Sequence, residues 1–578
     1  MKNLKNNLKF IWQYARENKF TFNIVLMINI INILLNIVMP ILSAKIIINL
    51  SINEYQKILF IALLLLIIET TTYFISKISK NLSTRIYQNT SQNLNEDLVK
   101  NLLTIQNKEL DNHKNGLFIQ RLTNDTSKMA DLFDTFLDIF TKIIWHIGIL
   151  LAILVISPII FIYILLCMII TSIIENHRTN IYAKEDKKYR KYIDNITGLI
   201  SEIVRGSKDI KMLNIEKAFI TEYNKKLKKI NNQKSIMQNT TNNYLLFNNV
   251  ISGIYSFALI LILILILEHN LISITFAIVI FNYYNHVKTF PYILGNLLTF
   301  LKDFNLSSTR IKEIIDGKEF KKETFGTKHI DKIEGTFEFN NVNFAYDKNP
   351  VLKNTTFKVN AGETVAFVGK SGAGKSTIFN LICKMYEINS GTITIDGIDI
   401  NELDKDSIRG NITIISQDPY IFNMSIKDNL KIVKKTMTEE EMVKACKEAC
   451  LDEFIETLPD KYDTIIGEDG VNLSGGEKQR LAIARALVQN TKIILFDEAT
   501  SALDNETQEK IKKAINNMQN DYTILMIAHR LSTIKNVGRI LYLDKGKIIA
   551  EGTHKELLKK CPKYKKLYEE ELLESEEN

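Results

Sequence analysis

Hydrophobic and polar residues divide the chain into two parts of different character. Long apolar runs fill the first part, whereas short apolar runs alternate with charged segments in the second. A bilayer core about 30 Å thick requires about 20 apolar residues in a helix. Six runs meet this requirement, at residues 22–50, 58–76, 136–156, 158–174, 245–267 and 272–294. Residues 21–305 are therefore predicted to form a membrane domain of six spanning helices.

The connections between these runs alternate between short and long. Little more than Ser157 and Pro158 separates the third run from the fourth, whereas about 70 residues separate the fourth from the fifth. Lysine and arginine concentrate in the long connections, with about fifteen between residues 178 and 234, and near the N-terminus. The positive-inside rule therefore places both long loops and both termini in the cytoplasm. Helical periodicity continues through the two loops, so each is expected to extend the spans and turn once, near 112–116 and near 205–207.

The first twenty residues carry an apolar stripe at helical spacing, with lysines opposite. The stripe consists of Leu4, Leu8, Ile11, Trp12 and Ala15. This pattern favours an amphipathic helix over residues 1–20 at the inner membrane surface. The alternative is a basic tail without fixed structure.

Polar residues inside the spans are costly, and they commonly face a cavity or a neighbouring helix. The sixth run has the densest cluster, from which the candidates for a substrate cavity are Asn282, Asn285, His286 and Lys288. Hydrogen bonding between helices is the alternative role for such groups. For Glu69 and Lys142 the sequence favours this structural role. For His286 and Lys288 it leaves the two roles open.

The second part of the chain has the composition of a soluble domain. Residues 306–333 are polar and suit a linker, and in residues 334–578 strand and helix patterns alternate, as in an α/β domain. Five scattered cysteines give no sign of a disulfide framework. The net charge is +8, and the basic residues behind it are concentrated where the positive-inside rule expects them. The charge therefore does not indicate nucleic-acid binding.

A glycine-rich loop follows the apolar run at residues 365–368. The loop matches the pattern G-x-x-x-x-G-K-[ST] and consists of Gly369, Lys370, Ser371, Gly372, Ala373, Gly374, Lys375, Ser376 and Thr377. Its glycines let backbone N–H groups approach phosphate oxygens, above the positive end of the following helix. In such a loop the lysine contacts the β- and γ-phosphates and the serine holds Mg²⁺. The sequence predicts a nucleotide site here, against the alternative of a turn that binds nothing.

Two further motifs follow. Residues 493–498 form an apolar strand that ends in Asp497, placed to hold Mg²⁺, and Glu498, placed to orient or deprotonate the attacking water. Upstream, the string LSGGEKQR at 473–480 exposes backbone N–H groups at the start of a helix, which makes a second anion site. One chain cannot easily fold both anion sites onto one phosphate, so two copies are expected to share it.

These motifs together resemble the ATP-binding cassette (ABC) transporters. Six spans ahead of a single such domain resemble the exporter-type half-transporters. The resemblance implies that Tyr346 stacks on adenine, that Gln417 contacts Mg²⁺ and senses the γ-phosphate, and that His529 touches the γ-phosphate. It further implies that Asp504 lies across the subunit interface and that the two cytoplasmic turns are coupling helices. Residues of the LSGGEKQR string would complete the ATP site of the other subunit: Ser474, Gly475, Gly476 and Gln479.

The expected function is ATP-driven export by alternating access, with catalysis by Glu498, His529 and Gln417 and with Mg²⁺ held by Ser376, Gln417 and Asp497. The active unit would be a dimer with a second half-transporter in a cell membrane, and the Ile, Asn and Lys content suggests a bacterial one. The cargo would be an amphipathic drug, lipid or peptide. The alternatives are import of siderophore-like cargo on the same architecture, and a soluble cassette ATPase. The residues decide neither the cargo nor the choice between homodimer and heterodimer.

Overall fold

The structure is a computed structural model of the 578-residue chain. It describes residues 2–113, 115–467, 470–497, 509, 513, 515, 522–528, 534–535 and 537–576. The chain forms two compact units. The first contains Met1–Thr104 and His113–Phe320, and the second contains Ile105–Asn112 and Lys321–Asn578.

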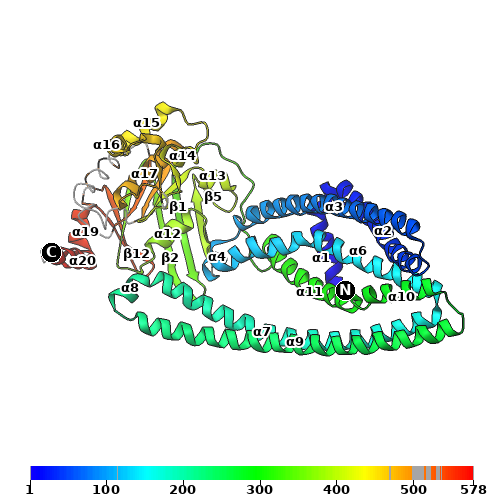
Figure 1. Ribbon diagram of the computed structural model, residues 1–578. Helices are drawn as coiled ribbons and strands as arrows, with labels where there is room; N and C mark the ends of the chain where they lie inside the picture. The colour runs from blue at the N-terminus through cyan, green and yellow to red at the C-terminus, as the bar shows by residue number, and fades with distance from the viewer. Residues whose placement is uncertain are drawn as a thin grey trace. The chain divides into compact units, whose positions relative to one another are not determined.

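The first unit is helical (Figure 1). Its helices are α1 (Lys2–Ala15), α2 (Lys19–Ser51), α3 (Tyr55–Leu102), α5 (Asn115–Gln120), α6 (Thr126–Ile156), α7 (Pro158–Arg205), α8 (Ser207–Met212), α9 (Glu216–Glu268), α10 (Ile274–Val287) and α11 (Phe290–Ile315). The short turns expected near 112–116 and 205–207 lie before α5 and before α8.

Three helices are far longer than a bilayer requires. Helices α3, α7 and α9 have 48, 48 and 53 residues. At 1.5 Å per residue each spans about 70 to 80 Å, more than twice the hydrocarbon core. Helices α7 and α9 pack against each other as a long antiparallel pair (Figure 1). The prediction that the spans continue as helices through the long loops is confirmed.

In the described part of the chain, five helical stretches are long and apolar enough to cross a membrane. The sixth predicted run, 272–294, is not one continuous helix, because α10 has 14 residues and α11 begins at Phe290. Pro291 stands in the first turn of α11, where its missing N–H breaks no hydrogen bond. The expectation of one continuous helix over this apolar run is therefore wrong.

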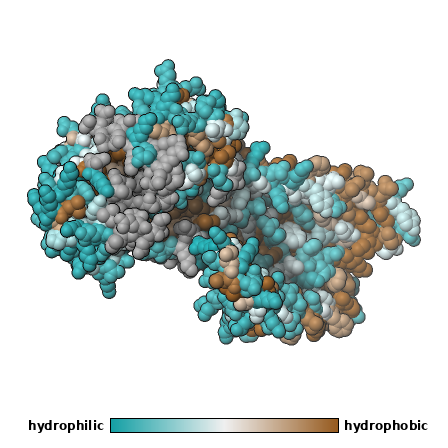
Figure 2. Space-filling view, turned by 90° about the vertical axis from the view of Figure 1, so that its left-hand side faces the viewer, coloured by the Kyte–Doolittle hydropathy of each residue, from teal (hydrophilic) through white to brown (hydrophobic). Residues whose placement is uncertain are grey.

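Apolar side chains cover much of the outer surface of the helical unit (Figure 2). On α2 and α3 the exposed ones include Met27, Leu34, Leu59, Phe60 and Leu63. Polar side chains on the same helices face each other instead: Ser79 donates to Asn29 at 2.7 Å, and Asn32 donates to Ser76 at 3.0 Å. This arrangement suits a lipid environment, where polar groups must be satisfied within the protein.

Helix α1 is amphipathic, as its sequence predicts, and part of its apolar stripe packs on protein. Ile11 and Ala15 are buried where α1 meets α3 and α11. Tyr14 donates a 2.5 Å hydrogen bond to Asp97, and Asn7 donates one to Asn305 at 2.6 Å. The N-terminal helix is therefore fixed to the helical unit by specific polar contacts.

Helix α11 extends to Ile315, so the first ten residues of the segment expected to be a linker are helical. Ser307, Ser308, Ile311 and Ile314 are buried there, and Ser307 donates to Asp125 at 2.7 Å. The polar composition of this stretch reflects hydrogen bonding inside the unit.

The second unit is an α/β domain. Its strands are β1 (Phe337–Tyr346), β2 (Asn349–Val359), β3 (Thr364–Val368), β4 (Ser390–Ile395), β5 (Ile398–Asp399), β6 (Ile412–Ile415), β7 (Met424–Ser425), β8 (Ile465–Ile466), β9 (Ile493–Asp497), β10 (Thr523–Ile527), β11 (Arg539–Asp544) and β12 (Lys547–Gly552). Its helices are α4 (Asn107–Asn112), α12 (Lys375–Ile382), α13 (Lys405–Arg409), α14 (Ile426–Lys431), α15 (Glu439–Glu448), α16 (Asp452–Thr457), α17 (Gly475–Gln489), α19 (His554–Lys560) and α20 (Pro562–Glu576).

Two larger sheets organise this domain. One has the order β2-β1-β4-β5 and is antiparallel. The other has the order β12-β11-β3-β10-β9-β6, parallel except for the edge strand β12. Strands β3 and β9 are almost wholly buried because both faces of the parallel sheet are covered, which explains why they read as continuous apolar runs. Because these strands run parallel, their carboxyl ends lie at the same edge of the sheet.

Aromatic rings fill the core on one face of the parallel sheet. Phe339 is fully buried and stacks on Phe357 with ring centroids 4.6 Å apart, and Phe357 in turn contacts Phe367 of β3. This cluster joins the antiparallel sheet to the parallel one.

We predict that Phe339→Ala destabilises the second unit by about 3 to 5 kcal/mol, because the substitution leaves a cavity in this aromatic cluster. The measurement is the urea concentration at which the detergent-purified full chain loses binding of a fluorescent ATP analogue. Ile549→Ala, at a side chain that is 44% exposed on β12, is the control. Equal midpoints for the two variants would contradict the packing described here.

Candidate functional site

The loop between β3 and α12 has a backbone that only glycine permits at two points. Gly372 and Gly374 have φ values of 76° and 106°. A Cβ at Gly369 would lie 2.1 Å from the Leu543 carbonyl oxygen, so β11 also requires glycine there. The loop therefore wraps tightly in front of the N-terminus of α12, where unpaired N–H groups attract an anion.

Lys375 opens α12 and is turned back over the loop. Its ammonium donates to the carbonyl oxygen of Gly369 at 2.7 Å and to that of Lys370 at 3.3 Å, and its side chain is 5% exposed. A cation held by neutral carbonyls above a helix N-terminus attracts phosphate oxygens. This geometry suits the predicted role of Lys375.

Ser376 and Asp497 come together from segments 121 residues apart. The Ser376 hydroxyl donates to the Asp497 carboxylate at 3.2 Å. Ser376 is the second residue of α12 and Asp497 the last residue of β9, so the two meet at the carboxyl edge of the parallel sheet. A hydroxyl and a carboxylate oxygen fit Mg²⁺, which takes one or two protein oxygens along with substrate phosphates.

The LSGGEKQR string starts helix α17 with a capping box. Ser474 is the N-cap: its hydroxyl accepts from Glu477 N at 3.3 Å, and the Glu477 carboxylate accepts from Ser474 N at 2.7 Å. Gly475 and Gly476 form the first helical turn. The predicted helix start is confirmed, and it has the small residues that let an anion approach the backbone.

Gln417 lies on a loop that is tied to α17. Its backbone carbonyl accepts from the side chain of Gln479 at 2.9 Å, and its neighbour Asp418 pairs with Lys478 at 3.1 Å. Arg485, which the sequence analysis did not single out, donates to the Tyr420 carbonyl at 2.8 Å. Burial lowers the pKa of Arg485 to about 10. The loop and the helix therefore form one structural element.

Tyr346 lies at the end of β1 beside two other rings. Its ring meets those of Phe344 and Tyr386 edge to face, at 4.8 and 5.1 Å. These three residues line a cavity of about 370 Å³ in the second unit. Strand β2 continues from this hairpin to Val351 and Leu352, which contact Gly374 of the glycine-rich loop.

Helix α4 belongs to this same unit and contributes two residues that the sequence analysis missed. Asp111 accepts a hydrogen bond from Tyr386, and Lys108 pairs with Asp347 at 2.9 Å. Burial raises the pKa of Tyr386, and the bond to Asp111 raises it further. No local signal marks these pairs, because their partners are more than 200 residues away.

Three of the predicted site residues lie outside the described residues: Glu498, Asp504 and His529.

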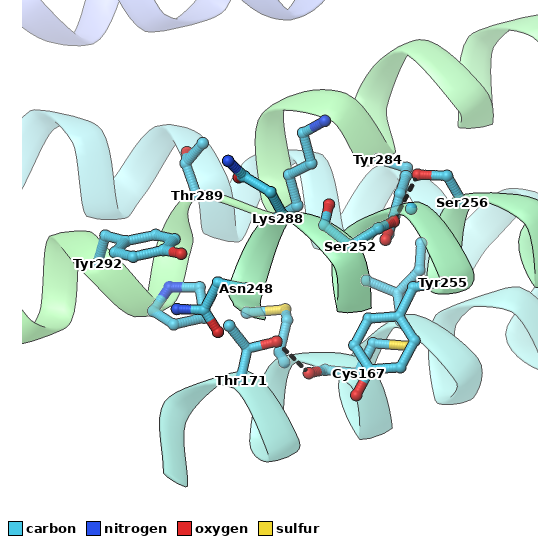
Figure 3. Close-up of a pocket in the computed structure, with 15 residues that line it drawn as sticks. Cys167, Thr171, Asn248, Ser252, Tyr255, Ser256, Tyr284, Lys288, Thr289 and Tyr292 are labelled. Carbon is cyan, nitrogen blue, oxygen red and sulfur yellow. Dashed lines mark hydrogen bonds between the residues drawn. The ribbon is translucent and has the colours of Figure 1, made fainter. Parts of the chain in front are cut away.

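The four cavity candidates of the sixth run do not all line the same cavity. Lys288 lines a cavity in the helical unit together with Asn248, Ser252 and Tyr284 (Figure 3). The other three candidates, Asn282, Asn285 and His286, are not among its lining residues.

Of the other polar groups singled out in the spans, His146 bonds to a second helix, whereas Lys142 and Glu69 do not show, among the described residues, the bonding between helices that was expected for them. His146 is buried, and its ring nitrogens lie 2.6 Å from the Lys142 carbonyl and 3.2 Å from the His286 carbonyl. Lys142 forms an exposed ion pair with Asp138 at 2.7 Å, one turn away on the same helix α6. Glu69 is exposed on α3.

Two family models match this chain. The ABC transporter transmembrane region matches residues 22–287, and the ABC transporter model matches residues 352–501. A Bacillus subtilis relative, described as the uncharacterised ABC transporter ATP-binding protein YfiC, is 30% identical over 98% of this chain and 94% of its own. The chain belongs to the ABC transporter family. It is a transport ATPase in which a helical membrane domain is joined to an ABC nucleotide-binding domain.

Other relatives agree with this assignment. An ATP-dependent lipid A-core flippase of Legionella pneumophila is 30% identical over 88% of this chain and 86% of its own. The flippase of Pasteurella multocida is 46% identical, but the match spans only 42% of each chain. The fold is that of a bacterial Atm1-family ABC exporter solved with ATP bound, at a TM-score of 0.81 and 24% identity over 96% of this chain and 98% of that one.

We predict that Lys375→Ala abolishes the rise in melting temperature that ATP produces, because the substitution removes the cation that faces the phosphates. Lys405→Ala, an exposed lysine at the start of α13, should leave the rise unchanged. An undiminished rise in the Lys375 variant would count against the phosphate-loop assignment.

We also predict that Asp497→Asn makes ATP binding insensitive to Mg²⁺, because a neutral amide binds the cation far more weakly than a carboxylate. The affinity for ATP is compared with and without the metal, using Asp406→Asn on α13 as the control. A normal Mg²⁺ effect in the Asp497 variant would remove this residue from the metal site.

Proposed function

We propose that the chain is an ATP-driven exporter that works as a dimer by alternating access. The observation that supports it most is the Ser376–Asp497 contact beside Lys375, since it places the parts of a nucleotide site in a chain whose other unit carries long apolar helices.

In this proposal, different residues of the chain carry out different parts of ATP hydrolysis. Lys375 and the N-terminus of α12 bind and orient the phosphates. Ser376, Asp497 and Gln417 would hold Mg²⁺, which neutralises charge on the phosphates when bound. Glu498 orients or deprotonates the attacking water, and His529 contacts the γ-phosphate.

Two copies are needed because each nucleotide-binding domain has two anion sites at different helix starts. One is the loop before α12, and the other is the start of α17. In the proposed dimer, ATP on the loop of one copy meets Ser474 and Gly476 of the other, with Asp504 at the interface. Shifting a two-state pathway from 1:99 to 99:1 needs about 5.5 kcal/mol of differential binding, which two interfacial nucleotides can supply. The partner is a second half-transporter, identical or different.

Helix α4 is proposed to couple the nucleotide site to transport. In sequence it lies between α3 and α5, yet it belongs to the second unit, where Lys108 and Asp111 contact the residues around Tyr346. A change in this nucleotide-binding domain on ATP binding would therefore act directly on α4.

The proposed cargo is an amphipathic small molecule, lipid or peptide, moved outwards across a bacterial cell membrane with the nucleotide-binding domains in the cytoplasm. Similarity over 88% of this chain to a protein named as a lipid A-core flippase supports a lipid-like cargo.

We predict that Glu498→Gln binds ATP with normal affinity and loses turnover by at least about a hundredfold, since general-base catalysis contributes typically that much. Phosphate release and ATP binding are measured on the same reconstituted protein, with Glu509→Gln as the control. Hydrolysis at the wild-type rate would refute the assigned role.

We predict that a variant with Lys108→Ala and Asp111→Ala keeps ATP hydrolysis but loses ATP-dependent accumulation of an amphiphilic dye in inside-out vesicles. The control is Lys461→Ala, which removes another exposed ion pair of the same unit. Hydrolysis and accumulation that fall in parallel would show that α4 only stabilises the domain. Accumulation confined to right-side-out vesicles would show import instead of export.

A further inference from the structure

The cavity around Lys288 has no assigned ligand. Its volume is about 360 Å³, and its lining comes from α7, α9, α10 and α11 (Figure 3). Helix α9 ends, and α10 begins, at one short turn between Glu268 and Ile274. At 1.5 Å per residue, Lys288 lies about 21 Å along α10 from that turn, and Asn248 about 30 Å along α9. The cavity therefore lies toward the end of the apolar runs that is farther from this turn.

A break in the helical backbone borders the cavity. Lys288 and Thr289 separate α10 from α11, and both line the cavity. At this break the carbonyl of His286 accepts from the backbone N–H of Thr289 at 3.1 Å and from the Thr289 hydroxyl at 2.8 Å, and it lies 3.2 Å from the His146 ring. Irregular backbone at membrane depth occurs where it is buried in protein or lines a cavity, and it is frequently a binding site.

Lys288 differs from two other charged side chains of the helical unit, which have ion-pair partners. Lys142 pairs with Asp138, and Arg178 pairs with Glu175 at 2.9 Å. Within the described ranges Lys288 has no ion pair, and its ammonium donates only to the neutral amide of Asn285, at 3.1 Å. The described residues that line the cavity include no Asp or Glu. A cation beside a cavity that is lined by neutral polar groups and no carboxylate favours an anionic ligand.

Asn248 supplies a second, independent observation. Its side chain is 5% exposed, and in the described structure neither its amide nitrogen nor its amide oxygen has a hydrogen-bond partner of good geometry, although the amide lies close enough to the Tyr292 hydroxyl for a weak interaction. Burying an amide without partners is costly, so such a residue beside a cavity is suited to a polar ligand. Ser252 and Tyr284 place hydroxyl groups on the same cavity, whereas α7 contributes the apolar residues Ile164 and Met168.

We propose that this cavity binds the anionic headgroup of an amphiphilic cargo, with Lys288 as the counter-charge and Asn248 as a hydrogen-bonding residue. The apolar residues of α7 receive the first part of the tail. The volume fits a headgroup rather than a whole lipid. This inference rests on the proposed export function and specifies the chemical class of its cargo.

The test measures equilibrium binding of radiolabelled monododecyl phosphate to the full chain in a non-ionic detergent without nucleotide. Unlabelled monododecyl phosphate should compete, and dodecyltrimethylammonium, with the same tail and the opposite charge, should not. Lys288→Gln should weaken binding roughly tenfold, because a charge-assisted hydrogen bond is lost. Lys288→Arg should restore it to near the wild-type level.

Two further variants keep the test decisive. Lys142→Gln removes a lysine of the same unit that is paired and does not line the cavity, so it should bind normally. Asn248→Leu, similar in size, should also weaken binding. Equal binding by the Lys288→Gln and Lys142→Gln variants, or equal competition by the cationic amphiphile, would overturn the proposal.

The binding test gives an answer whether or not the proposed export function is correct. Binding is measured in the Lys375→Ala variant as well, where ATP plays no part. Normal headgroup binding in that variant supports the cavity assignment even if ATP-driven transport fails, and loss of selectivity in an actively hydrolysing protein overturns the cavity assignment alone.

Discussion

The contact between Ser376 and Asp497 is the constraint on which the nucleotide site depends. It brings together a residue at the start of α12 and a residue at the end of β9, although β10 lies between β3 and β9 in the sheet. Parallel strand order makes this possible, because all the carboxyl ends reach the same edge. Apolar packing on both faces of the sheet fixes that order, so the aromatic core around Phe339 and Phe367 indirectly positions the two oxygen atoms that are proposed to hold Mg²⁺.

The helical unit obeys a different constraint. Where its outer surface is apolar, the polar groups of the spans have to find partners inside. The Asn29–Ser79 hydrogen bond and the Arg178–Glu175 ion pair are two examples of such internal partners. In the described part of the chain, Asn248 departs from this rule, as do Thr90 and Trp145. Of these three, Asn248 lines the cavity with Lys288, whose ammonium bonds to a neutral amide instead of a carboxylate. Departures from a strict physical rule are commonly found at functional sites, which is why the cavity, and not the most polar stretch of sequence, is the better guide to the cargo.

The sequence was sufficient where the determining interactions are local. The strand, loop and helix at 364–382 follow from an apolar run, three glycines and an amphipathic segment, and the start of α17 follows from its capping box. Prediction from the sequence failed where contacts between residues far apart in the chain determine the structure. The break before Pro291 was missed because hydropathy averages over it, and helix α11 was cut short because Ser307 and Ser308 read as a polar linker. The hydrogen bond between Tyr386 and Asp111 joins segments 275 residues apart, so no local sequence pattern predicts it. Gln417, Tyr346 and the α17 residues were placed by resemblance to a family, and their roles toward ATP remain predictions.

The most direct test of the account is the mass of the reconstituted particle, in ATP and Mg²⁺, compared with its rate of hydrolysis. A nucleotide shared between two nucleotide-binding domains predicts a particle of two half-transporters whenever hydrolysis runs at full rate. A particle that contains a single copy of this chain and still hydrolyses ATP at the full rate would contradict it.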